Sequence, residues 1–228
     1  MEPIYLQIAS QLRAELSGYE TGDYLPGELP LAKRFGVNRH TVRQALEVLA
    51  QEGYVLRVQG KGTQVLEAPL RYLMVEQSSY SNWFNTEGHA SEARLLGLKQ
   101  RVAEDKEIEL LVLEADAEVI QYSTLRLVKE TPTTMIRHVF SAKHKDLLSD
   151  YKKGSMRQYL RERGQVLTRD SSLIGARMPT SQESSRLKMP KNRPVLTVQT
   201  ISKNQDNEVF ELAFSVSRAD RLQYHIVT

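Results

Sequence analysis

The sequence predicts an α+β protein of two domains: a small helical domain that ends in a β-hairpin, and a larger domain built on an antiparallel sheet. Three observations support this prediction. Apolar residues recur at helical spacing up to Gly53. Apolar and polar residues alternate as in strands over much of the chain after residue 95. The segment Glu67-Ala68-Pro69 separates the two patterns, so we place the domains at residues 1–68 and 74–228.

Three helices are expected in the first domain. The first covers residues 3–17, where apolar side chains return every fourth position. The second is short, has Pro30 in its first turn and ends at Gly36. The third follows Asn38, whose side chain suits an N-cap. Its buried face should consist of Val42, Ala45, Leu46 and Leu49.

Residues 55–66 predict a β-hairpin whose turn is Gly60-Lys61-Gly62. A helix with bases at its amino terminus, followed by such a basic hairpin, is typical of a winged helix-turn-helix. The charge pattern agrees, because Lys33 to Lys61 contains six Lys and Arg residues but only two acids. A solvated helix face is the alternative explanation of that charge.

The third helix and the hairpin supply the groups that DNA recognition requires. Such a helix presents its amino-terminal side chains to base edges. Arg39 and Arg43 can each offer two donors to a guanine, whereas Thr41 and the helix amino terminus suit a phosphate. Lys61, between two glycines, can approach the DNA backbone closely. A single exposed arginine is usually only solvated, so the prediction depends on finding all these features together.

The second domain is expected to contain strands and three helices. Antiparallel hairpins should form at Glu130-Thr131-Pro132 and at Asn204-Gln205-Asp206-Asn207. Thr180 and Glu183 form a capping-box pattern that opens a helix ending near Lys188. The other two helices are expected at 105–111 and 155–162, and the strands at 95–102, 119–129, 133–142, 171–177, 195–203 and 209–217.

Several runs in the chain resemble a known family. Residues 3–66 resemble the winged helix-turn-helix of GntR-type regulators, through Gly22-Asp23-Tyr24-Leu25-Pro26, Leu31-Ala32-Lys33-Arg34-Phe35-Gly36-Val37, Asn38-Arg39-His40-Thr41-Val42-Arg43 and Gln59-Gly60-Lys61-Gly62. The second half resembles the chorismate-lyase-like ligand-sensing (UTRA) domain of the HutC branch. Its matching runs include Thr124-Leu125-Arg126-Leu127, Gly154-Ser155, Pro194-Val195-Leu196 and Ser215-Val216-Ser217-Arg218-Ala219-Asp220-Arg221. Within the family, the chain is most similar to the regulators of phosphonate utilisation.

The resemblance implies a set of DNA contacts. They fall on Asn38, Arg39, His40, Thr41, Arg43, Gln59, Gly60, Lys61 and Gly62. One departure affects this set. Many members begin the second helix with Glu-Arg-Glu-Leu, and that Arg touches DNA. This chain has Glu28-Leu29-Pro30-Leu31 there, so the contact is absent.

The resemblance also implies an effector site. A phosphonate is well bound by a guanidinium fork with hydroxyl or amide donors, and Ser155 would lie near a helix amino terminus. Glu211 could pair with the amine of an aminoalkylphosphonate, or could form an ion pair with Arg126 without any ligand. Thr124 and Ile136 stand where sugar-phosphate sensors carry Arg and Glu, which argues against an amino-sugar phosphate. The implied contacts are Ser81, Asn82, Arg126, Ser155, Arg157, Glu211 and Ser217.

Other kinds of site are not indicated. The chain has no Cys and its five His residues lack metal-ligand spacing, so neither a metal nor a cofactor is expected. We interpret His138 as a packed or surface imidazole. Gly60-Lys61-Gly62-Thr63 lacks the glycine that a nucleotide-binding loop needs five residues before its lysine, where Leu56 stands. No signal peptide or long apolar run is present, so we expect a cytoplasmic protein without a membrane partner.

Together these observations predict a homodimeric, ligand-responsive transcription regulator and not an enzyme. We expect a repressor of phosphonate-utilisation genes that binds an inverted-repeat operator and is released by a phosphonate or a phosphorylated metabolite. Three alternatives stay open: a regulator of another pathway, such as amino-sugar phosphate or histidine use, with a different small acidic effector; a lyase-like enzyme; and an architectural DNA binder without an effector.

Overall fold

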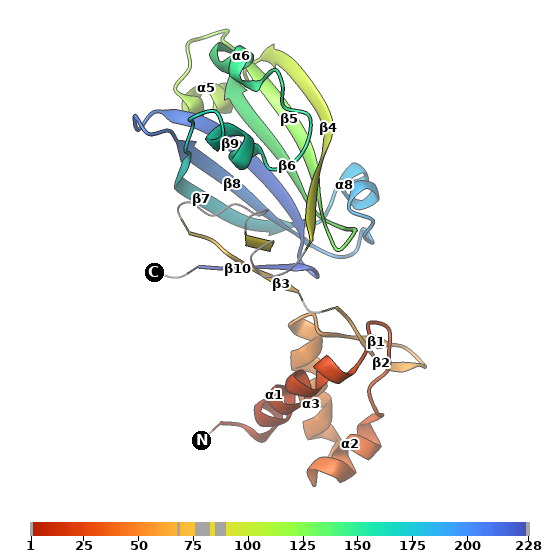
Figure 1. Cartoon of the computed structure of the whole chain (residues 1–228). Helices are drawn as coiled ribbons and strands as arrows, with labels where there is room; N and C mark the ends of the chain where they lie inside the picture. The colour runs from red at the N-terminus through yellow and green to blue at the C-terminus, as the bar shows by residue number, and fades with distance from the viewer. Residues whose placement is uncertain (1, 68, 76–82, 85–89, 227–228) are drawn as a thin grey trace. The chain divides into compact units, whose positions relative to one another are not determined.

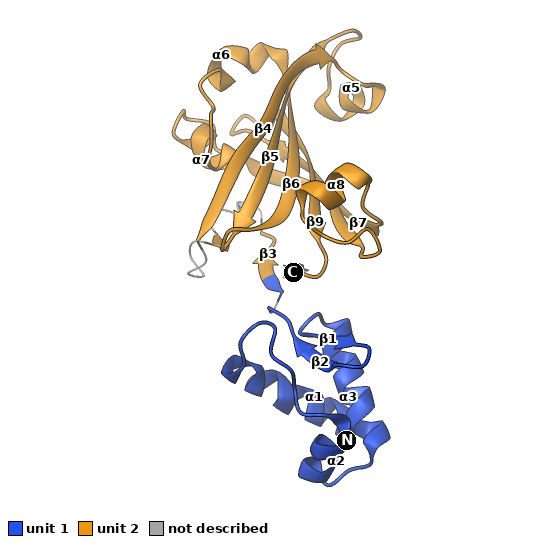
Figure 2. Ribbon diagram, turned by 90° about the vertical axis from the view of Figure 1, so that its right-hand side faces the viewer, with its two compact units in different colours: residues 1–70 blue, residues 71–228 orange. Residues whose placement is uncertain are grey.

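The computed structural model of the chain divides into two compact units, residues 1–70 and 71–228 (Figure 2). The structure describes all residues except 1, 68, 76–82, 85–89 and 227–228. Ser81 and Asn82, two of the expected effector contacts, lie outside the described residues. We describe each unit by itself.

Unit 1 contains the predicted three helices and hairpin (Figure 1). Val42, Ala45 and Leu49 are completely buried and Leu46 almost so, which confirms the predicted inner face of the third helix. They pack against Leu12 of the first helix and Leu31 of the second. The elements are α1 (Ile4–Glu15), η1 (Leu16–Gly18), α2 (Glu28–Phe35), α3 (Arg39–Gln51), β1 (Val55–Val58) and β2 (Gly62–Val65).

Two local features set the angle between α2 and α3. Gly36 ends α2 with φ of 64°, in the left-handed region that glycine enters without strain. Asn38 then begins α3, and its Oδ1 accepts a hydrogen bond of 2.8 Å from the backbone N–H of Thr41. The predicted stop at Gly36 and the predicted cap at Asn38 are therefore confirmed, and both help to set where the amino terminus of α3 lies.

The hairpin of unit 1 turns through Gly60 and Gly62, whose φ values are 74° and 115°. A third segment joins it, because the N–H of Leu25 donates to the carbonyl of Thr63 at 2.9 Å. This pairing was not predicted, because it joins residues about forty positions apart and no local pattern signals it.

Unit 2 is built on a six-stranded antiparallel sheet in the order β4-β5-β6-β9-β8-β7. The two predicted hairpins, β5-β6 and β8-β9, form neighbouring strand pairs within it. The strands are β4 (Ser91–Val102), β5 (Glu118–Val128), β6 (Thr131–Ser141), β7 (Thr168–Arg177), β8 (Val195–Lys203) and β9 (Val209–Arg218).

Helices cover both faces of this sheet (Figure 2). Helix α5 (Asp105–Leu111) packs Leu111 on one face, and α8 (Ser181–Arg186) precedes Leu187, which is buried on the same face. Helix α7 (Met156–Arg161) packs on the opposite face with Tyr122 and Phe140. Alternate residues of a strand point to opposite faces, so β5 contributes Tyr122 to the core under α7 and Val119 to the core under α5. The short η2 (Ala142–His144) and α6 (Lys145–Leu148), which were not predicted, lie between β6 and α7.

The β5-β6 turn differs from the prediction. Lys129 and Glu130 form it, with φ values of 47° and 63°, and Val128 pairs with Thr131. A two-residue hairpin of this kind needs positive φ at both central positions, which Pro132 cannot adopt. The predicted turn at Glu130-Thr131-Pro132 is therefore wrong by one residue, and Pro132 belongs to β6 at a register shift opposite Leu127.

A second, two-stranded sheet was missed entirely. It pairs β3 (Leu70–Leu73) with β10 (Leu222–His225), which are the first and last strands of unit 2. We call it the terminal ribbon. The N–H of Met74 extends the pairing by donating to the carbonyl of His225 at 2.8 Å. Each strand has only four residues and their partners lie at opposite ends of the domain, so sequence periodicity gave no signal.

One buried ion pair supports the α5 end of the sheet. Glu107 is 1% exposed. Each of its two oxygens accepts a hydrogen bond of 2.7 Å from Arg101. Its Oε2 also accepts a hydrogen bond of 3.0 Å from the backbone N–H of Glu104. Burial by itself would raise the pKa of Glu107, but these hydrogen bonds outweigh burial and the pKa lies below its ordinary value of 4.5. The carboxylate therefore stabilises the fold in its ionised form.

We predict that Glu107→Gln lowers the free energy of unfolding at pH 7 by about 1–3 kcal/mol, because Arg101 then loses a charged partner. A depressed pKa gives stability that is present above pH 4.5 and is lost as the pH falls through the folded-state value. Urea unfolding between pH 7 and pH 3 should therefore show a smaller acid-dependent loss in the variant. Glu109→Gln on the exposed face of α5 is the matched control, and equal pH profiles for Glu107→Gln and wild type would contradict the assignment.

Candidate functional site

The expected DNA contacts gather at the amino terminus of α3 and at the hairpin turn of unit 1. Arg39, with a side chain that is 67% exposed, and Arg43 both lie on the solvent side of α3. Thr41 is half-buried because it completes the N-cap of the helix. The other expected contacts are all exposed: Asn38, His40, Gln59, Gly60, Lys61 and Gly62.

A carboxylate missing from the predicted set organises this surface. Glu28, the first residue of α2, accepts a hydrogen bond of 2.7 Å from Nε of Arg39 and a second hydrogen bond from a terminal nitrogen of Arg57. Glu28 thus joins the first residue of α3 to strand β1. The hydrogen bond from Arg39 is the largest cause that holds the pKa of Glu28 below its ordinary value. The carboxylate is therefore ionised and orients both guanidinium groups.

A groove of about 480 Å³ runs along this bridge, between the start of α2 and the hairpin. Glu28, Arg39 and Arg57 line it together with the wing residues Gln59, Gly60 and Gly62. Leu29, which stands where many family members carry an arginine, is 67% exposed beside them. The sequence analysis missed Glu28 and Arg57 because an acid and a base 29 residues apart give no local signal of their pairing.

A second group of polar residues meets in unit 2, on the sheet face that α7 covers. It surrounds a small pocket with a free volume of about 50 Å³, enough for only a few waters. Four of the expected effector residues line this pocket: Arg126, Ser155, Arg157 and Glu211. The other lining residues are Tyr72, Met74, Ile136, His138, Met156, Arg169, Thr200, Ala213 and Ser215.

Ser217, another expected effector contact, is not among the lining residues. It is completely buried, and its hydroxyl lies 3.0 Å from Oγ1 of Thr134 and 3.0 Å from the hydroxyl of Tyr224. Its polar atom is therefore engaged between β6 and the terminal ribbon. We do not include Ser217 in the pocket.

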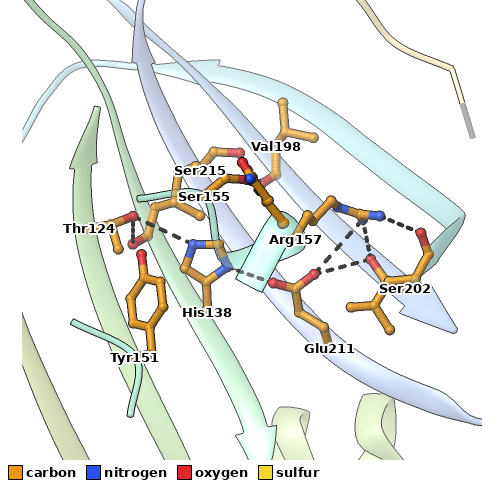
Figure 3. Close-up of polar contacts among 12 residues, drawn as sticks. Thr124, His138, Tyr151, Ser155, Arg157, Val198, Ser202, Glu211 and Ser215 are labelled. Carbon is orange, nitrogen blue, oxygen red and sulfur yellow. Dashed lines mark hydrogen bonds and ion pairs between the residues drawn. The ribbon is translucent and has the colours of Figure 1, made fainter. Parts of the chain in front are cut away.

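Glu211 lies at the centre of the pocket's polar network (Figure 3). Its Oε1 is 2.6 Å from Nδ1 of His138. Its Oε2 is 3.9 Å from a terminal nitrogen of Arg157 and accepts a hydrogen bond of 3.4 Å from Ser202. Burial alone would raise the pKa of Glu211, but His138 and then Arg157 and Ser202 outweigh burial and lower it. Glu211 is therefore an ionised carboxylate, and Nδ1 of His138 is the donor.

This network extends one sequence-based expectation and changes another. His138 is a packed imidazole, as one of the two interpretations held, since its side chain is only 10% exposed; it also lines the pocket. Glu211 was expected to meet a ligand amine or Arg126, but its oxygens contact His138, Arg157 and Ser202. The pairing of β6 with β9 determines these neighbours, and sequence spacing alone does not reveal it. Ser155 lies at a helix amino terminus, as expected, and its Oγ accepts a hydrogen bond of 3.3 Å from the backbone N–H of Gln158.

A larger hollow of about 870 Å³ lies on the opposite face of the sheet, along β4 to β9 and beside α8. Two of its cations are already paired, Arg137 with Glu107 at 3.7 Å and Arg177 with Glu183 at 2.7 Å. In a much smaller volume, the pocket beneath α7 is lined by three guanidinium groups, an imidazole and one carboxylate. Its chemistry fits a small anion better, so we assign the effector site there despite its smaller volume.

Two family profiles match the sequence. Residues 4–65 match the family described as "Bacterial regulatory proteins, gntR family", and residues 86–223 match the UTRA domain. The chain belongs to the GntR family. The predicted membership is confirmed, including the UTRA sensing domain of the HutC type.

Individual relatives agree with this assignment. The chain is 35% identical to the probable transcriptional regulator PhnF of Escherichia coli (strain K12), over 96% of this chain and 93% of that protein. It is 25% identical to the transcriptional repressor NagR of Bacillus subtilis (strain 168), over 97% and 93%. The crystal structure of PhnF from Mycobacterium smegmatis superposes with a TM-score of 0.72 at 25% identity, covering 97% of this chain and 98% of that one.

The family assignment fixes the general function. The protein is a transcriptional regulator and not an enzyme; its GntR domain binds DNA and its UTRA domain binds a small-molecule effector. Within the described part of the chain, no helix has both the length and the apolar character needed to cross a membrane. A search of the same residues finds no group of three His, Asp or Glu side chains placed to hold a metal ion.

We predict that Glu28→Gln reduces discrimination between operator and unrelated DNA by about tenfold, because Arg39 and Arg57 lose the group that orients them. The affinity for unrelated DNA should stay the same or increase, because the substitution removes one negative charge from the DNA-binding surface. Fluorescence anisotropy on both duplexes at several salt concentrations measures the two effects. Glu47→Gln makes the same charge change at an exposed position of α3 and should preserve discrimination. If the ratio of affinities for operator and unrelated DNA is unchanged in Glu28→Gln, then Glu28 does not contribute to recognition.

Proposed function

We propose that this protein is a homodimeric repressor of phosphonate-utilisation genes that a small phosphonate or phosphate ester releases from DNA. The observation that carries the proposal is the pocket beneath α7, which Arg126, Arg157 and Arg169 line together with a carboxylate that His138 and Arg157 already contact. Guanidinium groups bind phosphonate oxygens through paired, charge-assisted hydrogen bonds. The 35% identity to PhnF supports the same effector class.

The polar groups of the pocket also favour particular effector chemistry. Because Glu211 is occupied by His138 and Arg157, the lining offers cations and hydroxyl donors to a ligand but no unpaired carboxylate for an amine. Ser155 adds a hydroxyl from the opposite wall. The effector class that fits best is therefore a compact anion with a tetrahedral phosphorus group, with no requirement for an amino group.

The second candidate is a regulator of another pathway with a sugar-phosphate effector. At 26% identity the chain resembles the mannosyl-D-glycerate transport/metabolism system repressor MngR, whose name points to sugar metabolism. A phosphate ester would use the same guanidinium groups. The sugar would need further polar partners, and the small free volume of about 50 Å³ does not favour it. Thr124 and Ile136 also lie in this region, and neither side chain is charged.

For DNA recognition, we propose that two copies of the chain bind the two halves of an inverted repeat. A helix-turn-helix reads only a few base pairs, so a second head related by two-fold symmetry gives the operator enough length for specificity. Footprinting on the promoter region of the regulated genes tests this. Two protected half-sites related by a two-fold axis are expected, whereas a directly repeated or single half-site would contradict the proposal.

We predict that ethylphosphonate and 2-aminoethylphosphonate bind with dissociation constants within about threefold of each other, because an amine gains no carboxylate partner at Glu211. An available carboxylate would favour the amine by about 1.5–3 kcal/mol, which is tenfold or more. Isothermal calorimetry on the full chain gives both constants. A tenfold preference for the aminated compound would show that Glu211 leaves His138 to meet the ligand.

We further predict that Arg126→Ala keeps its affinity for operator DNA but no longer releases it when ethylphosphonate is added. Arg126 is 5% exposed, lines the pocket and belongs to unit 2, whereas the expected DNA contacts all belong to unit 1. Anisotropy with and without ethylphosphonate measures the response. Arg161→Ala, at an exposed position of α7, is the matched control and should respond as wild type does. A normal response in Arg126→Ala would remove this residue from the effector site.

A further inference from the structure

One arginine connects the pocket with the terminal ribbon. Arg169, near the start of β7, lines the pocket with its side chain. The same guanidinium donates a hydrogen bond of 2.9 Å to the carbonyl of Val75 and one of 3.3 Å to the hydroxyl of Tyr72. Both acceptors lie more than ninety residues earlier in the chain, on or just after strand β3. Arg169 was not among the predicted effector contacts.

Tyr72 extends the connection from the pocket into the ribbon. Its side chain is completely buried and also lines the pocket. Its ring packs edge-on against Tyr224 of β10, with centroids 6.0 Å apart and planes at 80°, and lies 6.2 Å from the ring of Phe84. On the other strand, the hydroxyl of Tyr224 lies 3.0 Å from Ser217 of the main sheet. The terminal ribbon is thus held to the six-stranded sheet at two points. Arg169 of β7 contacts strand β3 and the segment just after it, and Ser217 of β9 contacts strand β10.

Because of the position of β3 in the chain, this connection can affect the DNA-binding unit. The division between the two compact units falls between Leu70 and Arg71, inside β3. The polypeptide that leaves the DNA-binding unit therefore enters the sensing unit as this strand. Any shift of β3 against the six-stranded sheet acts directly on the segment that carries the DNA-binding unit.

We propose that Arg169 is both an effector-contacting residue and the residue that transmits pocket occupancy to strand β3. This inference rests on the proposed function, because it requires an anionic effector in the pocket. A phosphonate is larger than the free volume of about 50 Å³, so its entry displaces lining side chains. The guanidinium has five donors in a fixed plane, and turning them toward an anion redirects those that hold Val75 and Tyr72. The bound state therefore releases β3.

This mechanism is a two-state coupling in which effector and DNA favour different positions of β3. Coupling free energies between two sites typically change an affinity by about 5- to 150-fold. A purely structural Arg169 would behave differently. Its replacement would lower stability but leave the effector's influence on DNA affinity unchanged, since a contact that is equal in both states shifts no equilibrium.

The test separates effector binding from its consequence. The full chain, an operator duplex defined by footprinting, and ethylphosphonate as the probe give two quantities for each variant. Calorimetry gives the affinity for the probe, and anisotropy gives the coupling factor, which is the ratio of DNA dissociation constants with and without the probe. A third readout is intrinsic fluorescence, because Trp83 is the one tryptophan of the chain. Its Nε1 donates a hydrogen bond of 2.6 Å to the carbonyl of Arg71 on β3, so its emission reports on this strand.

Tyr72→Phe removes one acceptor of Arg169 and leaves the ring in place. At a probe concentration that saturates the variant, we expect its coupling factor to fall by about fivefold, the low end of typical allosteric couplings. The change in Trp83 emission on adding the probe should shrink in parallel. Arg169→Gln should lose about tenfold in affinity for the probe, as expected for a hydrogen bond to a charged group. Ser171→Ala, at an exposed position of β7, is the control and should match wild type in both quantities.

The outcomes distinguish the inference from the proposed function. If ethylphosphonate leaves the DNA affinity of the wild-type protein unchanged, the proposed effector class is wrong and the inference fails with it. If wild type responds but Tyr72→Phe keeps the full coupling factor, the proposed function stands and the transmission through Tyr72 is overturned. If Arg169→Gln binds the probe as wild type does, Arg169 is not an effector contact. Should Arg169→Gln fail to fold, Tyr72→Phe alone still decides the coupling.

Discussion

A completely buried carboxylate determines the character of the effector pocket. Taking an ionised acid out of water is opposed by several kcal/mol unless partners replace the lost hydration. For Glu211 these partners are His138, Arg157 and Ser202, contributed by β6, α7 and β8. The requirement to satisfy one acid therefore fixes the positions of an imidazole on the sheet and a guanidinium on the helix that covers it. Cations held in this way are already oriented for an anionic ligand, so less ordering is needed when it binds.

The DNA-binding unit also has an ionised carboxylate that holds basic side chains in place, in this case at its surface. Glu28 holds Arg39 of α3 and Arg57 of β1 within one groove, and its ionised state follows from the same kind of hydrogen bonding. In both units, an ionised acid orients the bases that we propose as contacts of an anionic partner. The environments differ, because Glu211 is 2% exposed, whereas the Glu28 side chain is 17% exposed and its interactions are weakened by salt.

Sequence reasoning succeeded where the determining interactions are local. The buried face of α3, the N-cap at Asn38, the left-handed stop at Gly36 and the capping box of Thr180 and Glu183 each depend on residues within about one or two helical turns. Resemblance to a family added Arg126, Ser155, Arg157 and Glu211, which the structure brings together around one pocket. What the sequence did not reveal are contacts between residues that lie far apart in the chain. The terminal ribbon and the partners His138, Arg169 and Glu28 all belong to this class, because no spacing rule links residues that are 29 or more positions apart.

A co-crystal structure of the full chain with ethylphosphonate tests the central claim most directly, namely that a carboxylate neutralised within the fold leaves a cationic pocket for an anionic effector. The account predicts phosphonate oxygens within hydrogen-bond distance of Arg126, Arg157 or Arg169, with Nδ1 of His138 still on Glu211. Density for the ligand in the open hollow on the opposite face of the sheet, beside Phe214 and Arg137, would contradict it.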